Sequence, residues 1–230
     1  MTAEDFQNGQ VLLIDKPLEW SSFQVVNKVR WLIRKQFDLK KIKVGHAGTL
    51  DPLATGLLIL CTGKYTKRIE TYQGQEKEYT GTITLGATTP SYDLETSVDA
   101  TFDLTELSEE KLHATVPQFV GAIAQQPPVF SALKKDGKRL YEFARKGKEV
   151  DIPTRTVTIS AFDLERIQLP EVDFRVVCSK GTYIRSLAHD FGKALENGGH
   201  LSALRRTRIG DFKIENALSI EAFETQIRSC

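Results

Sequence analysis

The stretch GHAGTLDPLATG, residues Gly45–Gly56, is the most informative segment of this 230-residue sequence. Its glycines permit tight turns and the close approach of a ligand to the backbone, and Pro52 disfavours the helical conformation for Asp51. We expect the whole stretch to be a loop. The Asp-Pro dipeptide leaves two interpretations of Asp51 open: the N-cap of a helix that starts at Pro52, or a loop carboxylate that points into a cleft. No GKS or GKT follows, which argues against a phosphate-binding loop.

Strand and helix patterns are mixed on both sides of this stretch. Alternating or continuous apolar residues predict strands at 11–15, 79–85, 157–167 and 172–178, the last two as an antiparallel pair that turns near Pro170. Helices are expected after Ser21 or Ser22, after Ser108, and over 182–195. Strands interspersed irregularly with helices favour an α+β fold over a regular βαβ series.

Charge is distributed unevenly along the chain, although 31 Lys and Arg nearly balance 30 Asp and Glu. The ionic residues from Asp93 to Glu110 are all acidic, whereas basic residues predominate from Lys134 to Arg155. Single charge runs are usually solvated faces, but a local basic surface is sufficient to bind nucleic acid. The sequence is therefore compatible with an RNA- or DNA-binding protein.

Other features indicate a cytoplasmic protein that does not cross a membrane. No apolar run approaches the ~18–20 residues of a membrane helix. Residues 1–10 carry Glu4 and Asp5 and do not resemble a secretory signal. The three cysteines, Cys61, Cys178 and Cys230, are far apart and form no CxxC pair, so neither a disulfide framework nor a cysteine-rich zinc site is expected.

The second informative segment is CSKGTYIRSL, residues 178–187. Tyr183 and Arg185 fall where a predicted strand gives way to a helix, a kind of junction that often carries function. The structural alternative is a tyrosine that covers the core and an arginine in a surface ion pair. His46, taken alone, is more typical of loop hydrogen bonding than of catalysis, and no histidine shows a metal-ligand spacing to another histidine or cysteine.

Together with LLIDKP (12–17), KEYTGTITLG (77–86), PPVFSALKKDGKRLYEFARKG (127–147) and LRRTRIGDF (204–212), these segments closely resemble the TruB family, the bacterial tRNA pseudouridine-55 synthases. The resemblance implies the pseudouridine synthase fold: a mixed, mostly antiparallel central sheet flanked by helices and loops. It also implies one catalytic domain over residues 1–230, with a basic RNA-gripping insertion at about 125–155. Because the chain ends at Cys230, the C-terminal PUA-type domain of many family members is expected to be absent.

The resemblance assigns roles within the active site. Asp51 matches the catalytic aspartate of GHxGxLDPxAxG, and His46 matches the histidine that is associated with the flipped-out RNA loop. Tyr79 matches the tyrosine that stacks on the target uracil, and its hydroxyl is expected to assist removal of the C5 proton. Tyr183 and Arg185 match the active-site tyrosine and arginine of GTYIR.

Further residues are expected around this centre. Leu204 matches the leucine that lines the uridine pocket, and Lys16 and Pro17 match the DKP motif that supports the active-site loop. The basic insertion is expected to contact phosphates of the RNA backbone through Lys134, Lys135, Lys138 and Arg139. The partner implied is the T-arm stem-loop of tRNA, and the simplest expectation for the family is a monomer.

The implied reaction is an isomerisation, so no cofactor and no metal is expected. Asp51 would act as nucleophile at the sugar, as nucleophile at the base, or as the base that removes a ribose proton, and the sequence leaves these three roles open. In each role the carboxylate must be ionised. We hypothesise that Arg185 keeps Asp51 charged and oriented.

Two other function classes remain as alternatives. A non-catalytic RNA-binding or tRNA-folding chaperone could use the same scaffold, although binding alone needs no loop carboxylate. A hydrolase that uses Asp51 and His46 is disfavoured, because five residues of loop fix no geometry and neither GxSxG nor HExxH is present.

Overall fold

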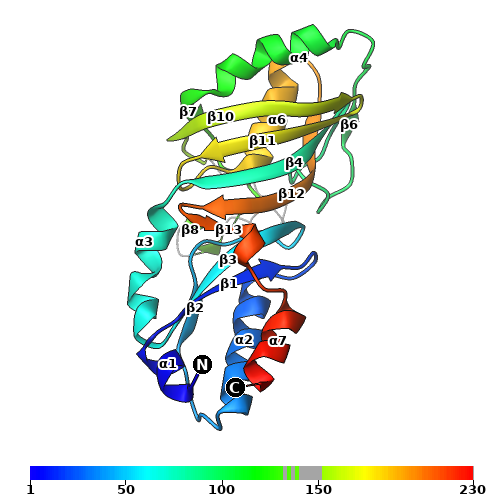
Figure 1. The fold of residues 1–230 in the computed structure, drawn as a ribbon. Coiled ribbons are helices and arrows are strands. Elements are labelled where there is room, and N and C mark those ends of the chain that lie inside the picture. Colours follow the sequence, from blue (N-terminus) through cyan, green and yellow to red (C-terminus); the bar gives the residue numbers. More distant parts are fainter. Residues whose placement is uncertain (132–133, 136–137, 140–151, 230) are drawn as a thin grey trace. The chain divides into compact units, whose positions relative to one another are not determined.

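The computed structural model describes residues 1–131, 134–135, 138–139 and 152–229. The chain divides into two compact units, of which unit 1 comprises Met1–Tyr79 and Leu204–Cys230 and unit 2 comprises Thr80–Ala203 (Figure 1). Along the chain, the boundary falls within β4 (Lys77–Leu85) and β12 (Gly199–Ile209). Helices and mostly antiparallel strands follow one another irregularly, which confirms the predicted α+β class. The expectation of one domain over 1–230 stays a prediction.

Unit 1 is built on three neighbouring strands. β3 (Ala54–Thr62) pairs antiparallel with β1 (Val11–Lys16) and parallel with β12, where Leu204–Arg206 lie opposite Ala54–Gly56. Short strands extend this arrangement, β2 (Val44–His46) on β3 and β13 (Phe212–Lys213) on β12. The helical elements are α1 (Ala3–Asn8), α2 (Ser22–Gln36), η1 (Gly63–Arg68), α3 (Ile69–Gly74), η3 (Ile214–Asn216) and α7 (Ile220–Arg228).

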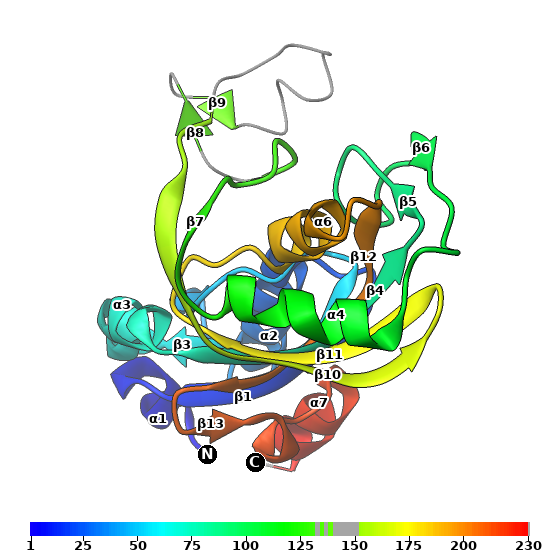
Figure 2. The same cartoon turned by 90° about the horizontal axis from the view of Figure 1, so that it is seen from above.

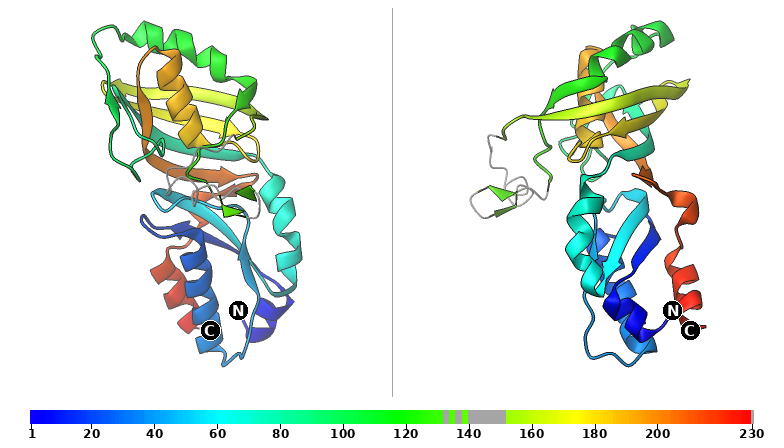
Figure 3. Two further views of the ribbon diagram at one scale, coloured as in Figure 1. Left: turned by 180° about the vertical axis from the view of Figure 1, so that it is seen from behind. Right: turned by 60° about the vertical axis from the view of Figure 1, so that its left-hand side comes forward.

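The core of unit 1 covers both faces of β3. Leu58 and Leu60 belong to a cluster with residues of α2 and α7, whereas Leu57, Ile59 and Cys61 belong to a second cluster. A strand buried on both faces must be apolar at every position, and this explains the uninterrupted run LLILC. Figures 1 and 3 show α2 and α7 side by side in this unit.

The sequence correctly places the start of α2. Ser21 is its N-cap: the Ser21 side chain accepts a hydrogen bond from the Gln24 backbone N–H, and the Gln24 side chain accepts one from the Ser21 N–H. This reciprocal capping box satisfies two backbone donors that the helix leaves unpaired. It also fixes the position of Ser22, the first helical residue.

Unit 2 contains the strand order β12, β4, β11 (Glu171–Cys178), β10 (Arg155–Gln168) and β7 (Gly121–Gln125). β10 and β11 form the predicted antiparallel pair. α6 (Ile184–Ala194) lies on one face of these strands (Figures 1 and 3), joined to them by edge-to-face contacts among Phe119, Phe162, Phe174 and Phe191. The remaining elements are β5 (Ala87–Thr88), β6 (Ala100–Thr101), α4 (Glu109–Thr115) and η2 (Val116–Phe119).

The segment predicted as an insertion leaves and rejoins the strands at neighbouring positions. Gln125, the last residue of β7, pairs with Arg155, the first of β10. Between them, β8 (Lys134–Lys135) pairs with β9 (Lys138–Arg139), and Figure 2 shows this pair beyond the end of β7. The sequence pattern at 140–144 predicts a helical turn, and these residues lie outside the part of the chain that the structure describes.

The prediction that Gly45–Gly56 is entirely loop is wrong at both ends, where β2 and β3 take up residues 45–46 and 54–56. Gly45 and Gly56 are needed for close packing rather than for a loop. A Cβ on Gly45 would lie 2.7 Å from Ile69 Cδ1, and one on Gly56 would lie 2.4 Å from the Arg206 carbonyl oxygen. Gly56 also has a φ of 104°, which side-chain-bearing residues rarely adopt.

We therefore expect Gly56→Ala to lower the free energy of unfolding by about 2–4 kcal/mol, from backbone strain and overpacking together. The measurement is urea unfolding followed by circular dichroism. Gly74→Ala is the matched control, because a Cβ on Gly74 meets nothing within 4 Å and should change the free energy of unfolding by less than about 0.5 kcal/mol. Equal stability of the two variants would contradict this account of Gly56.

Candidate active site

Asp51 lies between two residues whose backbone groups are held by other parts of unit 1. The Leu50 N–H donates to Ser22 Oγ at 2.8 Å, and Ser22 Oγ donates to the Leu50 carbonyl at 3.0 Å. The Pro52 carbonyl accepts from the Glu19 N–H at 2.9 Å and from Lys16 Nζ at 3.3 Å. The start of α2 and the end of β1 thus fix the backbone on both sides of the carboxylate.

The helix N-cap interpretation of Asp51 is wrong. Its carbonyl accepts from the Ala54 N–H at 3.1 Å, and the turn that this bond closes leads directly into β3. Asp51 is half-buried and stands on a seven-residue connection between β2 and β3, at 47–53. Asp51 is therefore a loop residue, which agrees with the alternative interpretation of a carboxylate on a loop.

Lys16 is fully buried beneath this turn. Besides Pro52, its ammonium donates to the carbonyls of Pro17 at 2.9 Å and Trp20 at 2.6 Å. Burial lowers the pKa of Lys16 to about 8, and the negative charge of Asp51 opposes that shift. Lys16 consequently still carries its charge at pH 7 and ties the segment after β1 to the residue that follows Asp51.

Arg206 is a second buried cation at this loop, and the sequence analysis missed it. From β12, its Nε donates to the Leu57 carbonyl at 2.7 Å, and its terminal nitrogens donate to Gly48 at 3.2 Å and Thr49 at 3.5 Å. Only 1% of its surface is exposed. The sequence feature that could have identified Arg206 is its place in the LRR motif, in which it is the second arginine. At this position of the strand its side chain must face inward.

Three other expected residues of unit 1 lie on strands, His46 on β2, Leu204 on β12 and Tyr79 on β4. His46, in β2, pairs with Leu60 of β3. Burial is the larger cause and the charge of Arg206 the smaller cause that lower the pKa of His46, so its ring is neutral at pH 7. Leu204 pairs with Ala54, and its carbonyl accepts from Thr55 Oγ1 at 3.4 Å. Tyr79 is buried in β4 with 8% of its surface exposed.

In unit 2, Arg185 makes a buried ion pair with Asp93. Arg185 Nε lies 3.5 Å from Asp93 Oδ2, and Arg185 Nη1 donates to the Ser91 carbonyl at 3.2 Å. Both side chains are more than nine-tenths buried, so the alternative of a surface ion pair is wrong. The pairing of Arg185 with Asp51 stays a prediction, because the two residues belong to different units.

Tyr183 is the N-cap residue of α6 and is held by Gln125, which the sequence analysis also missed. The buried Gln125 amide accepts from the Tyr183 N–H at 2.8 Å and donates to the Tyr183 carbonyl at 3.0 Å. The Arg155 guanidinium lies over the Tyr183 ring, 4.7 Å from its centre, and also donates to the Gly181 carbonyl. Nothing in the local sequence distinguishes Gln125 from a surface glutamine.

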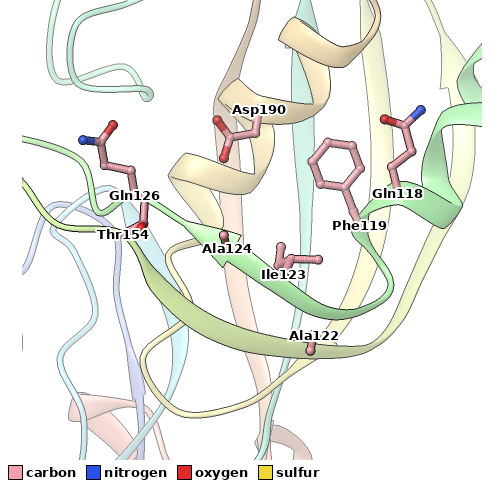
Figure 4. A pocket seen from close by; sticks show the side chains of 8 residues that line it. All are labelled: Gln118, Phe119, Ala122, Ile123, Ala124, Gln126, Thr154 and Asp190. Atoms are coloured by element: carbon pink, nitrogen blue, oxygen red, sulfur yellow. The ribbon is translucent and has the colours of Figure 1, made fainter.

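Among the described residues, an open pocket lies in each unit. In unit 2, Phe119, Ile123 and Asp190 line a space of about 520 Å³ (Figure 4), and burial raises the pKa of Asp190. In unit 1, a space of about 390 Å³ beside η1 is lined by four lysines, Lys41, Lys43, Lys64 and Lys67. The second pocket is therefore strongly basic.

Four basic residues of the expected RNA-gripping insertion lie in its described part. Lys134, Lys135, Lys138 and Arg139 are placed by their backbones in β8 and β9, and their contacts with RNA stay predictions. Within the described part of the chain, no three His, Cys, Asp or Glu side chains gather in a metal-binding cluster. None of the helices described is long and apolar enough to cross a membrane.

Comparison with known families identifies the class of protein to which this fold and this loop aspartate belong. Residues 34–184 match the TruB family pseudouridylate synthase N-terminal domain, and residues 185–229 match the tRNA pseudouridylate synthase B C-terminal domain. The chain belongs to the TruB family. Proteins called tRNA pseudouridine synthase B from Flavobacterium johnsoniae and Phocaeicola vulgatus are 62% and 55% identical to it. The alignments cover 99% and 95% of this chain and 100% and 93% of those proteins.

Solved structures support the same fold. A chain of a Cbf5–Nop10–Gar1 complex aligns with 96% of this chain at a TM-score of 0.71 and 32% identity, and a chain of the archaeal box H/ACA sRNP Nop10–Cbf5 complex aligns with 96% at 0.68 and 28%. This chain spans about half the length of those two chains, 55% and 54% respectively. The pseudouridine synthase fold implied by the sequence is thereby confirmed.

The lowered pKa of Lys16 predicts a pH dependence of stability. Between pH 8 and the ordinary lysine value of 10.5, the unfolded chain holds the Lys16 proton and the folded chain does not, so the contribution of this group to stability rises with pH across that window. We expect the free energy of unfolding of the wild type, relative to Lys16→Met, to increase from pH 7.5 to pH 10 in urea titrations. Lys213→Met, at an exposed lysine, should parallel the wild type. Parallel curves for Lys16→Met and the wild type would contradict the assignment.

Proposed function

We propose that this chain converts uridine to pseudouridine at position 55, in the T-arm loop of tRNA. The observation that carries the proposal is the Asp51 carboxylate, on a loop whose neighbouring carbonyls are held by Lys16 and Arg206, within the family's GHxGxLDPxAxG motif. Membership of the TruB family, together with relatives called tRNA pseudouridine synthase B that match along nearly their whole length, supports the reaction.

The reaction needs one well-placed carboxylate. The bond between uracil N1 and ribose C1′ breaks, the base turns, and a bond forms between C5 and C1′. The proton on C5 leaves and N1 takes up a proton, so the product is an isomer of the substrate. Asp51 serves as nucleophile at the sugar, as nucleophile at the base, or as the base that takes a ribose proton. A loop fixed on both sides of Asp51 holds its carboxylate in place for any of these roles.

The free-energy cost of extruding the target base from the RNA loop must be offset by new contacts. Unstacking a base costs on the order of a few kcal/mol, and stacking it on an aromatic ring returns about 1–3 kcal/mol. We assign the stacking to Tyr79 and the contact with the vacated space in the RNA loop to His46, whose neutral ring is able to pack between bases. Leu204 and Tyr183 line the remaining sides of the uridine in this proposal.

The grip on the tRNA is assigned to basic residues of both units. The lysines of the unit 1 pocket, Lys41, Lys43, Lys64 and Lys67, offer a concentrated positive charge that suits backbone phosphates. The insertion at about 125–155 adds Lys134, Lys135, Lys138 and Arg139. Because such contacts neutralise phosphates, binding should weaken as salt is raised. The proposal places the protein in the cytoplasm, as a monomer.

The alternative of a tRNA-folding chaperone without catalysis is tested by release of tritium from tRNA labelled at uracil C5. Asp51→Asn keeps the size of the side chain and removes its charge. We expect it to lower the release rate by at least about a hundredfold while tRNA affinity stays within a few-fold of the wild type. Asp211→Asn, an exposed aspartate of unit 1, should release tritium at the wild-type rate.

Two outcomes of this assay would contradict parts of the proposal. Tight tRNA binding without release by the wild type would favour the chaperone and contradict the proposal. Release by Asp51→Asn at the wild-type rate would retain an isomerase but remove Asp51 from its chemistry.

A further inference from the structure

Two stacked rings lie beside the Arg185–Asp93 ion pair in unit 2. The rings of Tyr92 and His189 are 3.9 Å apart between centres and inclined by only 14°. Tyr92 directly precedes Asp93, and His189 follows Arg185 by four residues on α6, so the two α6 side chains lie on the same face of the helix. Adjacent residues of one loop thus contact adjacent turns of one helix.

The loop that carries Tyr92 and Asp93 has an unfavourable backbone conformation. Tyr92 has a φ of 63°, in the left-handed region that a bulky residue rarely adopts. The Tyr92 N–H donates to the Thr89 carbonyl at 3.0 Å, and the Tyr92 carbonyl accepts from the Leu201 N–H at 2.9 Å. A strained residue persists only where its surroundings hold it, and the ring stack is the contact that its side chain provides.

The surroundings of His189 favour a neutral, packed ring. Burial and then Lys193 on the same helix lower the pKa of His189, and Asp99 opposes them. Burial, followed by the negative charges of Asp190 on α6 and of Asp99, raises the pKa of Tyr92. Nδ1 of His189 is buried without a hydrogen-bond partner in the described residues. His189 therefore contributes to this contact through its flat face.

We propose that the Tyr92–His189 stack is a clamp that holds Asp93 against Arg185 and so positions the Arg185 guanidinium for the isomerisation. Tyr92 and His189 are positioning residues that act through Asp93. This inference rests on the proposed function, because the role of Arg185 is defined by that reaction. The 3.5 Å contact between Arg185 Nε and Asp93 Oδ2 depends on the strained loop, because that loop carries Asp93.

The first test compares flat and non-flat side chains in tritium release from tRNA. His189→Ala and Tyr92→Leu remove the stack and should each lower kcat by about tenfold, with KM for tRNA within about twofold of the wild type. His189→Phe keeps a flat ring and should restore most of the rate. His113→Ala, at an exposed histidine of α4, is the matched control and should leave kcat unchanged.

The second test asks whether the clamp acts through Asp93. In an Asp93→Asn background, His189→Ala should lower the single-turnover rate by less than about twofold, because the ion pair it protects is already lost. A full tenfold loss in both backgrounds, or wild-type kcat in His189→Ala and Tyr92→Leu, would overturn the clamp. A wild-type protein that releases no tritium would instead refute the proposed function, so the two failures are distinguishable.

Discussion

The geometry of the Asp51 loop depends on two buried cations that donate hydrogen bonds to its backbone carbonyls. Lys16 reaches Pro52 from β1, and Arg206 reaches Gly48 and Thr49 from β12. A charge without water must be compensated, and here the compensation comes largely from carbonyl oxygens, which also become fixed in position. The loop between β2 and β3 is thereby held from two strands, and the carboxylate between its anchored residues has a defined location.

In unit 2, side chains likewise form hydrogen bonds with backbone groups and fix their position. Gln125 bonds both the N–H and the carbonyl of Tyr183, and Arg185 donates to the carbonyl of Ser91. Each contact ties the beginning of α6 to a segment distant in the chain. Functional residues in loops and at helix ends need such support, because regular secondary structure does not fix them.

Local patterns in the sequence were sufficient for much of the fold. The capping serine of α2, the alternation in β4 and the β10–β11 pair each depend on neighbours within a few residues. The motif resemblance located Asp51 without any structure. Local patterns failed where partners are remote: Arg206 bonds Leu57 across 149 positions, and the extent of β3 depends on the fit of Gly56 against Arg206. No local pattern distinguishes such residues from exposed arginines and loop glycines.

The most direct test of the central claim is amide hydrogen exchange at Ala47, Leu50 and Ala54 in Arg206→Lys. Lysine keeps the charge but cannot present the several donors of a guanidinium to Gly48, Thr49 and Leu57 together. The account predicts exchange at least about tenfold faster at these amides, the effect of losing one net hydrogen bond of about 1.4 kcal/mol. It predicts unchanged exchange in Arg205→Lys, whose guanidinium binds the side chains of Asp15 and Thr55 rather than backbone carbonyls. Wild-type exchange rates in Arg206→Lys would contradict it.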